Sequence, residues 1–154
     1  MPAFKNIYVI PARDAAVDSV DSMLTLTKII DNFKFEINKK NLPTNGVDVT
    51  DQNLLMPYQF IVATAWQVPK STNNSELNFR IVILDSKGNR HEGPLQNQGI
   101  PADFTRFNIT FTLNDLPVNG SGEYTIIAEL LSGKDGDVLA SGQFPLQVTL
   151  TVID

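Results

Sequence analysis

The chain has 154 residues, of which 42% are hydrophobic and 19% charged, and its formal net charge is −5 at pH 7. This balance is too apolar for a disordered chain, and its acidic sign is opposite to the basic surface that nucleic-acid binding requires. The lack of cysteine excludes disulfides and thiolate metal sites, and the single histidine, His91, excludes sites that need two imidazoles.

The first predicted element is a strand over residues 5–10, which we expect to end at Pro11 because proline cannot donate to a strand ladder. The apolar run before Pro11 is too short for the hydrophobic region of a secretory signal. No later run approaches the ~20 apolar residues of a membrane-spanning helix. We therefore expect a cytoplasmic protein that is not associated with a membrane.

Helical periodicity is weak along the whole chain, so we expect at most a short helical turn within residues 12–22 or 48–54. Apolar residues alternate over residues 24–30 and again over residues 33–37, with a change of parity near Asp31 and Asn32. Because a change of parity moves side chains to the other face of a sheet, it indicates a bulge or a crossing between sheets.

Period-two alternation, which places one set of side chains in a core, is strongest in the second half of the chain. It predicts four strands, over residues 77–83, 107–113, 124–130 and 144–152. Residues 60–68 are apolar at nearly every position, which indicates a strand that is buried on both faces.

Turn-forming residues separate these segments. Residues 85–88 and 133–136 each end in glycine and carry aspartate, which predicts two hairpins. Residues 38–53 and 90–103 read as long irregular connections, the latter rich in Gln, Asn, Gly and Pro. Since loops at the ends of β-sandwiches often carry recognition, these two connections are the first segments in which we expect a binding site.

Seven to nine short strands without βα alternation predict an all-β fold, an immunoglobulin-like antiparallel β-sandwich that forms a single domain over residues 1–154. Residues 113–124 end one strand, form an arch and begin the next strand with Tyr124. This arrangement is similar to the corner of immunoglobulin-like and fibronectin-like sandwiches, in which a tyrosine hydroxyl bonds to the arch backbone. Trp66 lies on a mid-chain apolar strand, where many sandwiches keep a core tryptophan.

Several short features follow one another in a fixed order: Ala12-Arg13-Asp14, residues 22–26, Ile29-Ile30-Asp31, residues 57–62 and the Gly-Glu-Tyr that begins at Gly122. This order resembles a group of uncharacterised, mostly bacterial single-domain proteins of about this length, which are expected to be immunoglobulin-like sandwiches. The resemblance covers most of the chain. It implies the sandwich fold and no catalytic residue.

Three side-chain patterns are candidate sites. Asp14, Asp18 and Asp21 carry oxygen ligands suited to calcium, but no Asp-x-Asp-x-Asp-Gly loop is present, so we interpret them as solvated turn residues. His91 has no recognisable nucleophile in the sequence and reads as a surface residue. Ser121 lies between two glycines, but without the spacing of a nucleophile elbow, and reads as a turn. We therefore predict no catalytic residue, no metal site and no cofactor.

Nine phenylalanines against one tryptophan and three tyrosines favour core packing over a stacking platform for sugars. Lys34, Lys39 and Lys40 lie near acidic residues and form no basic stripe. Our leading hypothesis is a non-catalytic protein-interaction or structural module, with another protein or a weak homo-oligomer as its partner. The alternative is a small-ligand or carbohydrate-binding module. An enzyme that uses carboxylates such as Asp14 or Glu92 ranks last, because two acidic groups would have to converge.

Overall fold

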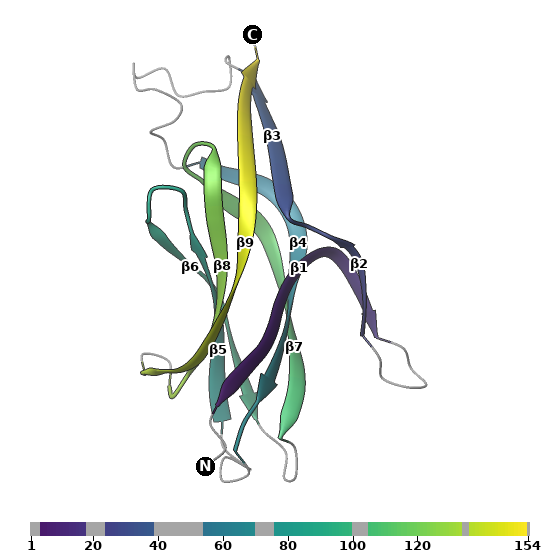
Figure 1. Ribbon diagram of the computed structural model, residues 1–154, viewed down its shortest axis with the longest axis vertical. Coiled ribbons are helices and arrows are strands. Elements are labelled where there is room, and N and C mark those ends of the chain that lie inside the picture. Colours follow the sequence, from purple (N-terminus) through teal and green to yellow (C-terminus); the bar gives the residue numbers. More distant parts are fainter. Residues whose placement is uncertain are drawn as a thin grey trace.

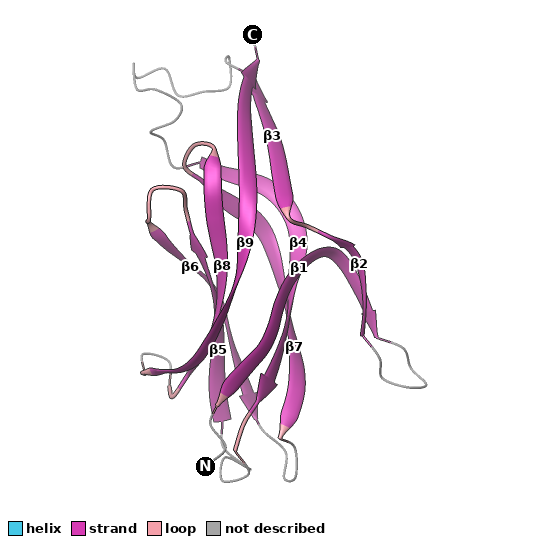
Figure 2. Ribbon diagram, viewed as in Figure 1, coloured by secondary structure: helices cyan, strands magenta, loops and turns pink. Residues whose placement is uncertain are grey.

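Two β-sheets packed face to face form the described part of the molecule (Figure 1). The computed structural model describes residues 4–17, 24–38, 54–69, 76–99, 105–133 and 136–153, and none of these residues lies in a helix, so none of them forms a helix that could cross a membrane (Figure 2). The strands are β1 (Lys5–Val17), β2 (Leu24–Ile29), β3 (Asn32–Asn38), β4 (Leu54–Gln67), β5 (Glu76–Leu84), β6 (Arg90–Gly99), β7 (Arg106–Val118), β8 (Gly122–Leu131) and β9 (Val138–Ile153). The protein is an all-β sandwich, as the alternation predicts.

One sheet has four strands in the order β2-β1-β4-β7, and the other has five in the order β3-β9-β8-β5-β6. Neighbouring strands are antiparallel, with the exception of β3 and β9, which run parallel. β3 crosses over from the first sheet to the second, where it pairs with β9, the last described strand, at the edge of the sheet. Figure 1 shows β3 and β9 side by side, at the end of the molecule where the chain terminates.

The crossing between sheets lies at Ile30 and Asp31, where the sequence changes parity. Ile29 at the end of β2 is exposed, whereas the alternate residues Phe33, Phe35 and Ile37 of β3 are buried. The backbone carbonyl of Asp31 accepts a hydrogen bond of 3.0 Å from the Gln147 N–H of β9 and so fixes the start of β3. Of the two interpretations of the parity change, the crossing is confirmed.

The first strand is longer than expected. β1 runs through Pro11 to Val17, so the expected strand end at Pro11 and the expected helical turn within residues 12–22 are both wrong for the described residues. β1 pairs with β4 up to Ala12 and with β2 from Ala12 onward. The Pro11 carbonyl accepts a 2.9 Å hydrogen bond from Ile30 N–H, so the missing proline donor falls at the end of the β1–β2 ladder.

The expected irregular connection over residues 90–103 is also corrected, because β6 occupies its first part as a regular edge strand. Ile81 of β5 lies opposite Gly93 and Pro94 together, which makes a β-bulge. A Cβ on Gly93 would lie 2.9 Å from the Ile81 carbonyl oxygen, so this position requires glycine. Residues 100–104 lie outside the described residues, as do residues 39–53, which include most of the other expected connection and turn.

The four most strongly predicted strands are confirmed as β5, β7, β8 and β9, and each predicted hairpin joins two neighbouring strands of the second sheet. In the β5–β6 hairpin, Gly88 has a φ of 85°, the left-handed conformation that a tight turn requires. Residues 134 and 135 at the tip of the β8–β9 hairpin lie outside the described part of the chain.

The core lies between the two sheets and is rich in aromatic rings. Trp66, Phe60, Phe79, Phe111 and Tyr124 are fully buried, which confirms the core position expected for Trp66. The Trp66 and Phe79 rings, from opposite sheets, have centroids 5.3 Å apart. β4 is buried on both faces over residues 62–66, within the continuous apolar run that predicts it, whereas residues 54–59 alternate between half-buried and exposed.

Candidate functional site

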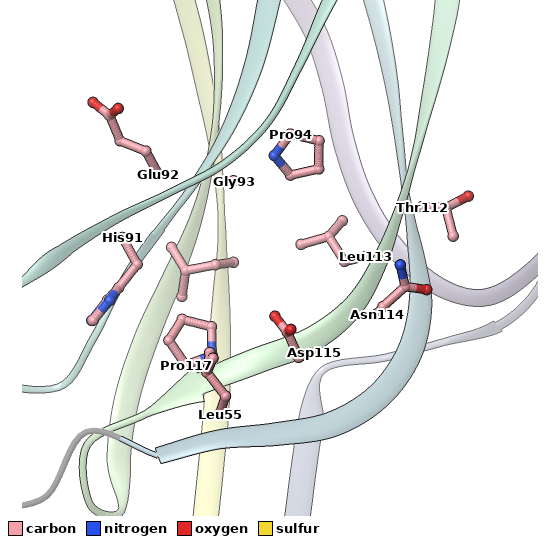
Figure 3. A pocket seen from close by; sticks show the side chains of 11 residues that line it. Leu55, His91, Glu92, Gly93, Pro94, Thr112, Leu113, Asn114, Asp115 and Pro117 are labelled. Carbon is pink, nitrogen blue, oxygen red and sulfur yellow. The ribbon is translucent and has the colours of Figure 1, made fainter.

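The two long sides of the sandwich differ in how they close. On one side β1 lies against β9, and the Asn6 side chain lies over Gly142, where an added Cβ would displace it. On the other side β6 and β7 are the edge strands of their sheets, and a hollow of about 410 Å³ opens between them (Figure 3). The sandwich is therefore closed along β1 and β9 and open along β6 and β7.

The base of the hollow is apolar. Pro94 of β6 and Leu113 of β7 face each other across it, and Leu55 and Pro117 lie together at one end (Figure 3). Leu113 is part of the buried core, whereas Leu55 is 68% exposed. An exposed leucine beside a solvent-open hollow provides an apolar surface that a partner can cover.

The rim of the hollow is acidic. Asp115 and Glu92 line it, and no lysine or arginine does so. The Asp115 carboxylate is directed into the open space, and the Glu92 carboxylate is directed away from it (Figure 3). The hollow thus combines an apolar base with one carboxylate, that of Asp115, directed into it.

β6 offers backbone groups beside this hollow. Among the described strands it pairs only with β5, so alternate N–H and C=O groups on its other edge point out of the sheet. From Leu95 to Gly99, beyond the bulge, it carries no charged residue, and Leu95 is 42% exposed. The Gln96 side chain donates a 3.3 Å hydrogen bond to the Thr110 carbonyl of β7, which joins the two sheets next to the hollow.

The Asp85 carboxylate holds the hairpin that leads into β6. One carboxylate oxygen, Oδ1, accepts hydrogen bonds of 2.9 Å from the backbone N–H groups of Lys87 and Asn89. The other, Oδ2, lies 2.8 Å from His91 Nε2. Because an ionised carboxylate can only accept, Nε2 carries the proton of this hydrogen bond. Burial raises the pKa of Asp85, but the hydrogen bonds from His91, Asn89 and Lys87 have the larger effect and lower the pKa to about 2.

His91 is therefore not the plain surface residue that the sequence suggests. Its side chain is 24% exposed and paired with a carboxylate that is fully buried. No hydroxyl group of the described residues hydrogen-bonds to the ring. The pair anchors β6 to the end of β5.

A second charged cluster cross-links the outer face of the five-stranded sheet. The buried Glu129 of β8 accepts hydrogen bonds from Arg80 Nε and Nη2, at 3.2 and 2.8 Å, and a further one from Arg90. Arg80 Nη1 also lies 3.3 Å from Glu92 Oε1. These ion pairs join β8, β5 and β6, so the cluster acts as a structural tie.

The residues singled out in the sequence do not converge. Asp14 is exposed, and one of its oxygens accepts the Ala15 N–H at 2.8 Å, while Asp18 and Asp21 lie outside the described residues. Asp14 and Glu92 are on different sheets. No group of three or more His, Asp or Glu side chains that could hold a metal ion occurs within the described ranges. Ser121 is a turn residue whose hydroxyl accepts the Leu150 N–H at 2.8 Å.

The sequence indicates only one part of the hollow: residues 90–103, where a binding site is expected, supply His91, Glu92, Gly93 and Pro94, but their meeting with β4 and β7 is not predicted. Leu55, Pro94 and Asp115 come from three strands, and nothing in their local sequence indicates that they meet. Asp85 did carry a signal, since an aspartate at the first position of a turn commonly bonds to backbone N–H groups two residues further on.

No family model matches the chain, and no curated protein does so. The chain shows only weak likenesses to solved structures. The chain is similar to β-glucosidase 3B from Thermotoga neapolitana, solved with α-D-glucose, at 9% identity and a TM-score of 0.41, over 63% of this chain and 15% of the glucosidase. It is also similar to the N-terminal domain of PorA, at 9% identity and a TM-score of 0.27, over 92% of this chain and 97% of that domain. Neither likeness indicates a function for this chain.

Proposed function

We propose that the protein is a non-catalytic interaction module that binds an extended segment of another protein along β6. The observation that carries the proposal is the position of the hollow directly beside an unpaired strand edge. In strand addition, main-chain hydrogen bonds supply affinity and pockets for alternate side chains supply specificity. The β6 edge offers the main-chain hydrogen-bonding groups, and the hollow between Pro94 and Leu113 offers a pocket for a side chain.

The side chains around the hollow support a binding role over a catalytic one. His91 is engaged by Asp85, and Glu92 faces Arg80. A hydrolytic site needs a nucleophile and a base, or two carboxylates, held at a reacting bond. Glu92 and Asp115 point in different directions in Figure 3, so they do not form such a pair in this arrangement.

A small-ligand or carbohydrate-binding module is the second candidate. The volume of about 410 Å³ falls within the range of roughly 300–1,000 Å³ that is usual for small-molecule sites. Sugar sites, however, usually stack the ligand on an aromatic ring, and no Phe, Tyr or Trp lines this hollow. The strand edge beside it favours a peptide.

Amide hydrogen exchange tests the proposal. The protein is incubated with ten-residue peptides that alternate threonine with leucine, and exchange is followed in all strands. We expect slower exchange of the backbone amides of β6, both beside the hollow and between Leu95 and Gly99, and unchanged exchange in the edge strands β2 and β3, which serve as internal controls. Protection of a different edge, or no protection by any peptide, would overturn the proposal. Thermal stabilisation by monosaccharides in the absence of peptide binding would support the alternative.

A further inference from the structure

We infer that the segment bound along β6 carries a lysine or arginine two positions from an aliphatic residue. This inference rests on the proposed function and names the chemistry of the partner. It comes from the combination, in one hollow, of an apolar base with the carboxylate of Asp115, which forms no ion pair with the described part of the chain.

The charge of the rim is only partly balanced within the protein. Asp115 is exposed and forms no ion pair with the described part of the chain. Glu92 is 60% exposed, and its partner Arg80 also binds Glu129 through two of its nitrogens. A cationic side chain that reaches this rim would therefore meet a carboxylate that is free to pair with it, in a protein of net charge −5.

The base of the hollow fits an aliphatic side chain. Leu113, Pro94, Pro117 and the exposed Leu55 surround it (Figure 3). Covering the exposed surface of Leu55 would remove apolar area from water, which favours binding at roughly 25 cal/mol per Å² of apolar surface. A charged side chain placed at this base would lose hydration without a partner.

The spacing between the apolar base at Leu113 and the carboxylate of Asp115 matches the two-residue side-chain period of a strand. Leu113 and Asp115 are two residues apart on β7, and both line the hollow. In an extended segment, residues two apart point to the same side and are separated by roughly 6.4–6.8 Å. A segment that adds to β6 can therefore present an aliphatic side chain to Leu113 and a basic one to Asp115.

The test uses three labelled ten-residue peptides with the same alternating threonine and leucine pattern. In each peptide one leucine is replaced, at the position two residues after a central leucine. The replacement is lysine, glutamine or glutamate. Binding is measured by fluorescence anisotropy at low and high salt. We expect the lysine peptide to bind about two- to five-fold more tightly than the glutamine peptide, and the glutamate peptide to bind most weakly, with the differences reduced by salt.

Variants of the protein identify the residue responsible for the preference for lysine over glutamine. Asp115→Asn should abolish most of the preference for lysine over glutamine while leaving the affinity for the glutamine peptide unchanged. Glu123→Gln, which removes an exposed carboxylate of β8 that does not line the hollow, is the matched control and should keep the preference. Leu55→Ala should weaken all three peptides alike, with Ile29→Ala, another exposed aliphatic residue, as its control.

The outcomes separate this inference from the proposed function. Equal binding of the three peptides, with protection of β6 amides, overturns the inference and leaves the proposed function standing. A lysine preference that persists in Asp115→Asn also overturns it, because the preference then reflects net charge. Failure of every peptide to bind overturns the proposed function itself. Self-association that protects β6 and excludes the peptides makes a second copy the occupant and overturns the inference.

Discussion

The Tyr124 hydroxyl accepts a 2.6 Å hydrogen bond from the backbone N–H of Asn119, five residues earlier, and donates a 2.7 Å hydrogen bond to the Gly120 carbonyl. Burial raises the pKa of the Tyr124 hydroxyl, which therefore stays protonated and able to donate. These bonds join the end of β7 to the start of β8, although the two strands belong to different sheets. The corner that the sequence predicts is confirmed.

Replacing Tyr124 by phenylalanine should destabilise the protein by about 1–3 kcal/mol, because the buried Asn119 N–H and the Gly120 carbonyl lose their partner. The free energy of unfolding is measured by urea denaturation. Tyr58→Phe is the control, since the Tyr58 hydroxyl bonds to no atom in the described ranges of the chain. Equal losses in the two variants would contradict a role for the corner hydrogen bonds.

Gly122→Ala should destabilise the same corner by about 1–3 kcal/mol. Gly122 has a φ of 149°, and an added Cβ would lie 2.7 Å from the Ser86 Cβ. Ser86 in turn donates a 3.0 Å hydrogen bond to the Asn119 carbonyl, so a displaced Ser86 would disturb the arch as well. Gly99→Ala is the control, because its Cβ would meet no atom within 4 Å. Thermal denaturation should show a lower Tm for Gly122→Ala and nearly the wild-type Tm for Gly99→Ala.

Features set by local alternation could be predicted from the sequence. The core strands bury one face, so their side chains must alternate, and the crossing at Asp31 leaves its mark as a change of parity. The β6 strand was not predicted, because its sequence lacks this apolar alternation. As an edge strand with a bulge, it buries little apolar surface, and its Pro94 and Gly93 look like loop residues. The first part of β1 is predicted, but its continuation from Pro11 to Val17 is not, because Pro11 reads as a strand end and the pairing changes from β4 to β2 at Ala12.

The hollow could not be predicted because it depends on how the sheets are placed. Pro94 and Leu113 face each other only because β6 and β7 are the edges of different sheets on the same side of the sandwich. No periodicity within either strand encodes that relation. The pairing of Asp85 with His91 is easier to predict, since both residues flank a hairpin that the sequence does predict.

Glu129→Gln should destabilise the protein by about 1–3 kcal/mol. The change leaves Arg80 and Arg90, with side chains 17% and 42% exposed, beside each other without the carboxylate between them. The expected loss is smaller than for a fully buried pair, because solvent screens Arg90. Glu92→Gln is the control, since its carboxylate is 60% exposed and should contribute no more than about 1 kcal/mol. Urea denaturation distinguishes the two, and an equal effect of both changes would argue against Glu129 as the centre of the cluster.

Asp85→Asn should remove a pH-dependent part of the stability. The pKa of Asp85 is about 2 in the folded protein, against 3.8 for an unperturbed aspartate, so between these values the unfolded chain binds the proton more readily. The stabilisation, about 2 kcal/mol from this shift, is therefore fully present above pH 4 and is lost as the pH falls through 2. Urea unfolding of the wild type and of Asp85→Asn between pH 6 and pH 2 should show a gap that narrows toward low pH. The exposed Asp137→Asn serves as the control. A gap of constant size across this range would mean that the Asp85 carboxylate does not stabilise the hairpin through its charge.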